Sequence, residues 1–119
     1  MPTRSLHSRV MKWPDRATVD AAARAWARRI ADEHEDVVRL GYFGSYARGD
    51  WGVGSDLDLV AVVRQSQYPF HQRASQWNRS ELPVHADLLV YTEAEWESLM
   101  QHGGRFAEML HNETVWLIA

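Results

Sequence analysis

The stretch that decides the fold covers residues 44–58 and reads GSYARGDWGVGSDLD. It begins with a Gly-Ser turn and ends, after a glycine-rich loop, with Asp56 and Asp58 at the start of an apolar segment. Successive side chains of a strand point to opposite faces, so these two carboxylates share one face. Two ionised carboxylates repel each other, and burial increases the repulsion unless a cation lies between them. The stretch therefore predicts a divalent-cation site beside a turn that can hold phosphate.

The Gly-Ser turn is the other half of this predicted site. Gly44 lets the backbone approach a phosphate, and Ser45, expected as the N-cap of one helical turn, offers a hydroxyl and a peptide N–H where anions bind readily. Magnesium prefers oxygen ligands and usually takes one or two carboxylates together with substrate phosphates. The chain contains no Gly-Lys-Ser/Thr and no Gly-x-Gly-x-x-Gly, which argues against P-loop and Rossmann-type sites. The pattern indicates phosphoryl or nucleotidyl transfer from a metal-bound nucleoside triphosphate.

A third carboxylate, Asp87, is the only acid inside the apolar segment 84–91. An unpaired carboxylate in such a strand is costly. If this strand lies beside the strand over 57–64, Asp87 joins the other two acids around a pair of metal ions, which would orient an attacking hydroxyl and stabilise the leaving pyrophosphate. Asp87 is then both a metal ligand and the proton acceptor. The alternative is that Asp87 pairs with Arg48 or Arg64.

Three neighbouring residues have open roles. Arg48 could reach a phosphate, or pair with Asp50 or Asp56. Trp51, in the glycine-rich loop, could stack on a base, meet a partner, or pack within its loop. His85 shares a strand face with Asp87 and could lie near the ions, or be an ordinary surface or core histidine.

Hydrophobic periodicity predicts an α/β (α+β) domain that fills residues 1–119, with a mixed sheet of three to four strands packed by helices. Thr92 and Glu95 form a capping box, and the Gly103-Gly104 pair breaks the helix that follows. The expected helices cover 15–34, 70–79, 92–101 and 105–111, with a single turn at 45–49. The expected strands cover 37–43, 57–64, 84–91 and 115–118.

Composition narrows the class of protein. The chain of 119 residues has no cysteine, which excludes disulfides and thiolate zinc sites, and its net charge of −3 argues against tight binding to nucleic acid. Residues 1–10 contain charges without an apolar run, so we expect no signal peptide, and no apolar stretch is long enough to cross a membrane. A cytoplasmic location is the expectation. Six tryptophans are many for this length, and we expect some to face a partner or a ligand.

The run Gly44-Ser45-x-Ala47-Arg48-Gly49, followed by Ser55-Asp56-Leu57-Asp58-Leu59-Val60, resembles the signature of the DNA polymerase β-type nucleotidyltransferase superfamily. The short chain is similar to its minimal branch, the MNT proteins that are often paired with HEPN-domain toxins. The resemblance implies a palm-like fold. It also implies that Gly44, Ser45 and Arg48 hold the triphosphate of ATP, and that Asp56, Asp58 and Asp87 bind Mg²⁺, with two ions expected, and complete the catalytic site.

Three functions follow as hypotheses. The first is an enzyme that places AMP from ATP on a hydroxyl of a protein, as the antitoxin of a HEPN/MNT pair, because a small palm leaves little room to recognise a small acceptor. The second is an enzyme that modifies a small molecule, as aminoglycoside nucleotidyltransferases do. The third is a binding antitoxin that neutralises its partner by contact without catalysis.

Overall fold

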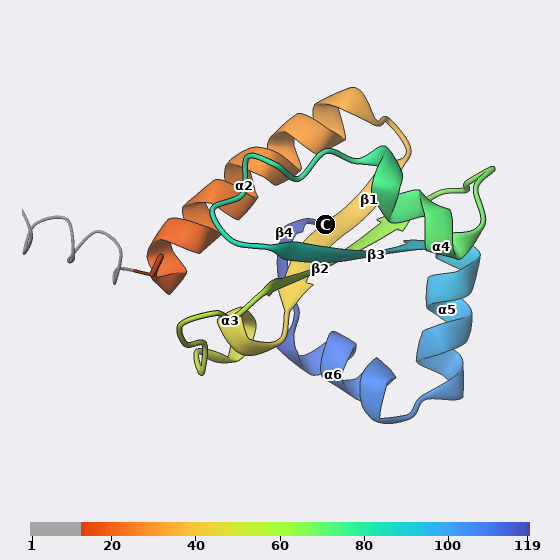
Figure 1. Cartoon of the computed structure of the whole chain (residues 1–119). Coiled ribbons are helices and arrows are strands. Elements are labelled where there is room, and N and C mark those ends of the chain that lie inside the picture. Colours follow the sequence, from red (N-terminus) through yellow and green to blue (C-terminus); the bar gives the residue numbers. More distant parts are fainter. Residues whose placement is uncertain (1–12) are drawn as a thin grey trace, which may run out of the picture.

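The computed structural model describes residues 13–119, and its centre is a four-stranded sheet in the order β3-β2-β1-β4 (Figure 1). β1 pairs antiparallel with both β2 and β4, whereas β2 and β3 run parallel. The predicted α+β fold with a mixed sheet is therefore confirmed. The strands are β1 (Val37–Phe43), β2 (Leu57–Val63), β3 (Ala86–Thr92) and β4 (Val115–Ile118).

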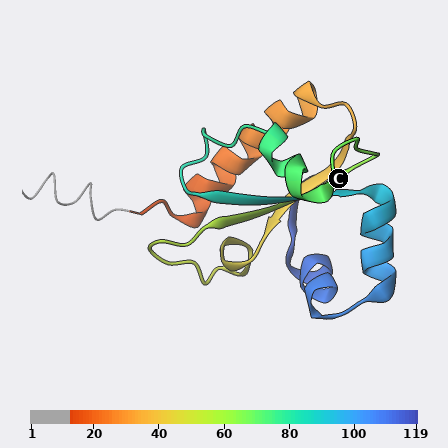
Figure 2. The same cartoon turned by 45° about the vertical axis from the view of Figure 1, so that its right-hand side comes forward.

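Helices cover both faces of this sheet (Figure 2). One face is covered by α2 (Arg16–Glu33), whose buried residues include Val19, Trp26 and Ile30. Its start is fixed by Asp15, whose carboxylate accepts a hydrogen bond from the Thr18 backbone N–H. These residues form one apolar cluster with the side chains from alternate positions of β2. The long helix predicted from the apolar periodicity is therefore confirmed.

The opposite face packs against α5 (Glu93–His102) and α6 (Arg105–Glu113). The predicted capping box is present: the Thr92 side chain accepts from the Glu95 N–H, while the Glu95 carboxylate accepts from the Thr92 N–H. Gly103 and Gly104 adopt φ values of 70° and 100°, which end α5 and reverse the chain into α6. The Gly-Gly pair thus breaks the helix, as predicted.

Two predictions about the helices need correction. Ser45 is the first residue of α3 (Ser45–Arg48) and not its N-cap, because Gly44 occupies the cap position. The helix expected over 70–79 is shorter, consisting of α4 (Phe70–Arg73) and the 3₁₀ turn η1 (Ala74–Gln76). It ends there because Trp77 is extended and buried in the apolar cluster against α2.

The expectation that some tryptophans face a partner or a ligand stays a prediction. Trp26 and Trp77 are buried, and the other four are partly buried within the fold. Among the described residues, the large apolar side chains that are most exposed are not tryptophans: Val53, Tyr68, Phe70 and Phe106.

Within residues 13–119, no helix has both the length and the apolar character that crossing a membrane requires. Residues 1–10, where we expect no signal peptide, lie outside the described part of the chain.

Candidate metal and nucleotide site

The parallel pairing of β2 and β3 places Asp58 directly opposite Asp87. Asp56 precedes β2 by one residue and shares the alternation of Asp58, since Leu57 and Leu59 are fully buried on the face that packs against α2. Asp58 is partly buried, whereas the side chains of Asp56 and Asp87 are 50% and 62% exposed. The strand arrangement therefore brings the three predicted acids to one open end of the sheet.

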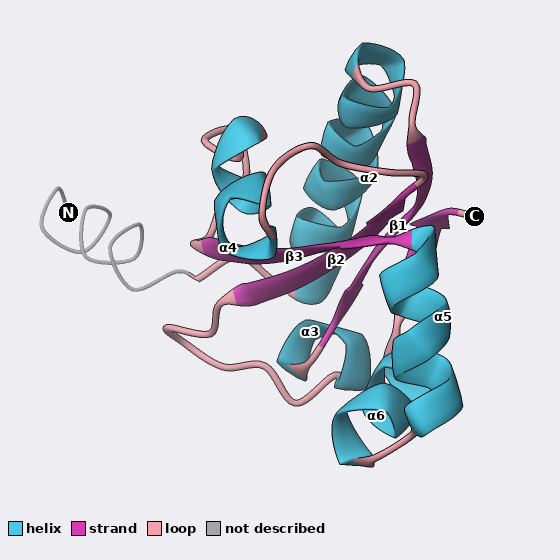
Figure 3. Cartoon of the chain, turned by 90° about the vertical axis from the view of Figure 1, so that its right-hand side faces the viewer, coloured by secondary structure: helices cyan, strands magenta, loops and turns pink. Residues whose placement is uncertain are grey.

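The Gly-Ser turn lies against the most buried of these acids. Phe43, at the end of β1, pairs with Asp58 across the sheet, and Gly44 follows it with a φ of 77°. A Cβ atom added to Gly44 would lie 2.2 Å from Asp58 Oδ2. Only glycine permits both this backbone conformation and this close approach. A long loop then leads from α3 to β2 (Figure 3), so the two ends of the sequence motif meet in space.

The electrostatic surroundings of the Asp58 carboxyl group favour a cation beside it. Burial raises the pKa of its carboxyl group above the ordinary value, and the negative charges of Asp87 and Asp56 raise the pKa further. Arg48 opposes these effects only in part. The clustered carboxylates thus repel one another in the protein alone, and a divalent cation would relieve this repulsion. The oxygen-rich, exposed donor set fits Mg²⁺, which keeps several waters and binds substrate phosphates.

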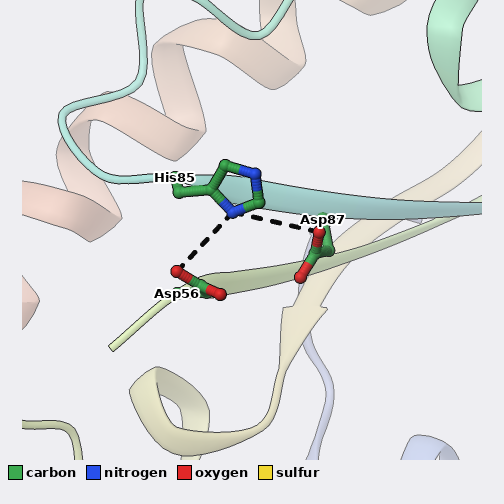
Figure 4. A group of neighbouring side chains, drawn as sticks. All are labelled: Asp56, His85 and Asp87. Atoms are coloured by element: carbon green, nitrogen blue, oxygen red, sulfur yellow. Dashed lines mark ion pairs between the residues drawn. The ribbon is translucent and has the colours of Figure 1, made fainter. Parts of the chain in front are cut away.

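His85 lies beside the acids. From the sequence it could either lie near the ions or be an ordinary surface or core histidine. Its Nδ1 atom is 3.6 Å from Asp56 Oδ1 and 3.9 Å from Asp87 Oδ1 (Figure 4). One ligand atom from each of these residues can be chosen so that all three lie within 4.8 Å of one another. The signal available from sequence was the alternation of residues 85 and 87 on one strand face.

The arginines do not pair with the third acid. Arg48 Nε donates to Asp50 Oδ2 at 3.1 Å, and its Nη1 atom lies 3.6 Å from Glu113. Arg64 donates to the backbone carbonyl of Glu35. In this structure Asp87 therefore pairs with neither Arg48 nor Arg64, which was the alternative to a metal-binding role. Arg48 lies on α3 next to the turn, and its role in phosphate binding stays a prediction.

Trp51 packs within its own region of the fold. Its ring stacks on Tyr46, with centroids 5.5 Å apart and planes 10° from parallel. Tyr46 is fully buried and its hydroxyl accepts a hydrogen bond from Trp13 Nε1. This contact holds the loop between α3 and β2 against the core. Of the three roles considered for Trp51, the structure shows packing within the loop.

Comparison with known proteins agrees with this geometry. Residues 24–117 match the family described as nucleotidyltransferase domain. A crystal structure from Sulfolobus solfataricus, of a protein provisionally assigned as a nucleotidyltransferase, is similar with a TM-score of 0.61 and 19% identity, over 85% of this chain and 80% of that one. At that identity the likeness concerns the fold. No curated protein sequence matches the chain significantly.

The family match places the chain in the nucleotidyltransferase class, and its mixed sheet carries a Gly-Ser turn beside a cluster of acids. The chain belongs to the nucleotidyltransferase domain family and is a transferase of nucleotidyl groups.

Proposed function

We propose that the protein is a Mg²⁺-dependent enzyme that transfers AMP from ATP to a hydroxyl group of a protein partner, as the antitoxin of a HEPN/MNT toxin–antitoxin pair. The observation that carries the enzymatic part is the convergence of Asp56, Asp58 and Asp87 beside the Gly44 turn. The pairing with a HEPN-domain protein rests on the sequence resemblance.

Each part of the site has a role in this proposal. Asp56, Asp58 and Asp87 would hold Mg²⁺, which when bound neutralises phosphate charge and orients the reacting oxygens. Ser45 and the backbone of Gly44 would hold the triphosphate, with Arg48 turning from Asp50 toward a phosphate oxygen. The acceptor oxygen bonds to the α-phosphorus as the bond to the β-phosphate oxygen breaks. Asp87 takes the hydroxyl proton, and pyrophosphate leaves.

Two features support a protein as the acceptor. The side chains of Asp56 and Asp87 are at least half exposed, so a hydroxyl on a large molecule can approach them. Exposed apolar side chains flank the same end of the sheet: Val53 in the loop before Asp56, and Phe106, whose ring meets Phe43 edge-on at 6.0 Å. Apolar side chains next to an open polar site are common at protein interfaces.

A separate hollow of about 560 Å³ lies at the other end of the same strands, where Val63 and Val90 line it together with Trp77. The three acids are not among its lining residues. Its position gives no reason to place the acceptor there.

The test is incubation with α-labelled ATP and Mg²⁺, with and without the protein that is encoded beside this one. Label transferred to that protein by the native chain, and lost with Asp58→Asn, supports the proposal. Asp50→Asn is the matched control, because Asp50 is an exposed acid that contacts Arg48 and not the acid cluster. Transfer to an aminoglycoside alone would instead identify a small-molecule enzyme. If Asp58→Asn neutralises the protein encoded beside it as fully as the native chain does, the chain is a binding antitoxin.

A further inference from the structure

His85 gives the acid cluster a nitrogen atom that a site for Mg²⁺ alone does not need. It immediately precedes β3, and its backbone carbonyl accepts a hydrogen bond from the Leu57 N–H at 2.9 Å. This bond holds the start of β3 against the start of β2. The His85 side chain therefore leaves the sheet on the same face as Asp87, although 70% of its surface is exposed.

The distances suit ligands around an ion better than a hydrogen bond. Nδ1 lies 3.6 Å from Asp56 and 3.9 Å from Asp87, which is longer than a good N–H···O bond. Zinc–nitrogen and zinc–oxygen bonds of about 2.1 Å place the ligand atoms of a tetrahedral site about 3.4 Å apart. The two separations from Nδ1 need only a small contraction to reach this spacing, and the three ligand atoms all lie within 4.8 Å of one another. Figure 4 shows Nδ1 facing both carboxylates from β3 and from the start of β2.

The donor type decides which ion is preferred. Carboxylates suit Mg²⁺, whereas imidazole suits zinc and related transition metals. One nitrogen and two oxygen donors with an open side leave the fourth position to water or substrate, as in zinc sites that are not purely structural. Asp58, deeper and next to Gly44, remains outside this outer group.

We propose that His85, Asp56 and Asp87 form a subsite that binds Zn²⁺ or a similar imidazole-binding ion in preference to Mg²⁺. The inference extends the proposed function, since Asp56 and Asp87 also belong to the predicted Mg²⁺ site. Sharing these carboxylates means that the two ions compete, so Zn²⁺ occupancy opposes the binding of Mg²⁺.

The test measures Zn²⁺ binding to the nucleotide-free full-length protein by competition with a chromogenic chelator. Loss of one ligand predicts that His85→Gln weakens Zn²⁺ binding by at least about tenfold, since even loss of groups that only support a ligand costs that much. His71→Gln is the matched control, because His71 is an exposed histidine on α4 at the far end of β3. It should bind Zn²⁺ as the native protein does. Mg²⁺ binding should be unchanged in both variants.

A second readout follows the histidine itself. Zn²⁺ should shift the Nδ1 resonance of His85 in nitrogen-detected NMR, while the resonances of His71 stay in place. Unchanged Zn²⁺ affinity in His85→Gln, or an Nδ1 resonance that Zn²⁺ does not move, overturns the inference. Label transfer by the native protein reports separately on the proposed function, so either idea can fail while the other stands.

Discussion

Asp58 is the residue on which the site depends most, because it is the most buried of three carboxylates that repel one another. Its raised pKa means that the folded protein holds the Asp58 proton more tightly than the unfolded chain does. The stability contributed by this group is thus present in acid and is lost as the pH rises through the raised pKa. At neutral pH the ionised Asp58 destabilises the metal-free fold.

We therefore expect Asp58→Asn to raise the free energy of unfolding of the metal-free protein at pH 7. The gain should be on the order of 1 kcal/mol, the repulsion between two unit charges about 4 Å apart in water. It should disappear as the pH falls and the native carboxyl becomes protonated. Urea denaturation in a chelator across this pH range measures it. Asp50→Asn should not raise the free energy of unfolding. An equal gain in Asp50→Asn would show that the charge of Asp58 does not destabilise the fold more than that of another acid.

Gly44 permits a contact that no other residue could make. We expect Gly44→Ala to lower nucleotidyl transfer by about 10²-fold, because the new methyl group displaces the Asp58 carboxylate by about 1 Å. The backbone at φ 77° adds a stability cost of about 1–3 kcal/mol. Steady-state rates and denaturation curves separate the two effects.

Gly54→Ala provides the control for backbone strain. Gly54 has a similar φ of 88°, but a Cβ atom there would meet no atom within 4 Å. This variant should lose stability and keep most of its transfer rate. Equal loss of rate in both variants would show that the approach of Gly44 to Asp58 is unimportant.

At the scale of elements, β3 is joined to α4 and α5 by one buried arginine. Arg73 donates to the Val90 carbonyl at 3.0 Å and to both carboxylate oxygens of Glu95. Glu95 also caps α5 through Thr92. The bond from Arg73 lowers the pKa of Glu95, with a further contribution from Thr92. The stability from this contact is present above the ordinary pKa of a glutamate and is lost as the pH falls through the lowered value.

Glu95→Gln should therefore cost about 1 kcal/mol or less at pH 7, since the Glu95 side chain is 43% exposed. The difference from the native protein should vanish in acid, where the native Glu95 is also neutral. Thermal unfolding as a function of pH measures this. Glu97→Gln, on the same helix, should show little effect at any pH. A cost for Glu95→Gln that persists in acid would contradict the role given to its charge.

The elements also show what the sequence could and could not predict. β1 and β4 have the predicted bounds because turn residues and strongly apolar runs define their ends. β3 begins at Ala86 and not at Val84 because β2 begins opposite Ala86, at Leu57. A strand's length depends on its neighbour, which periodicity cannot reveal. The adjacency of β2 and β3, which unites the acids, was an assumption in sequence and is observed in the structure.

The side-chain neighbours of the site were harder to predict. Arg48 contacts Glu113, which lies at the end of α6 and far away in sequence. The approach of Gly44 to Asp58 follows from the pairing of Phe43 with Asp58. Such contacts depend on how elements pack, whereas the motif itself follows from local spacing.

At the scale of the whole molecule, ion binding should be coupled to folding. A ligand that binds only the folded protein stabilises it by about 2.7 kcal/mol at a concentration 100-fold above its Kd. We expect Mg²⁺ with a non-hydrolysable ATP analogue to raise the Tm of the native protein and of Asp50→Asn. The rise should be lost in Asp87→Asn, as scanning calorimetry would show. An undiminished rise in Asp87→Asn would exclude that residue as a ligand.

The most direct measurement is a crystal structure of the native protein grown with Mn²⁺ and a non-hydrolysable ATP analogue, with anomalous scattering used to locate the ions. We predict anomalous peaks in direct contact with Asp56, Asp58 and Asp87, with the triphosphate lying along Gly44 and Ser45. Ions bound elsewhere, or a nucleotide held away from an acid cluster that stays free of Mn²⁺, would contradict the account.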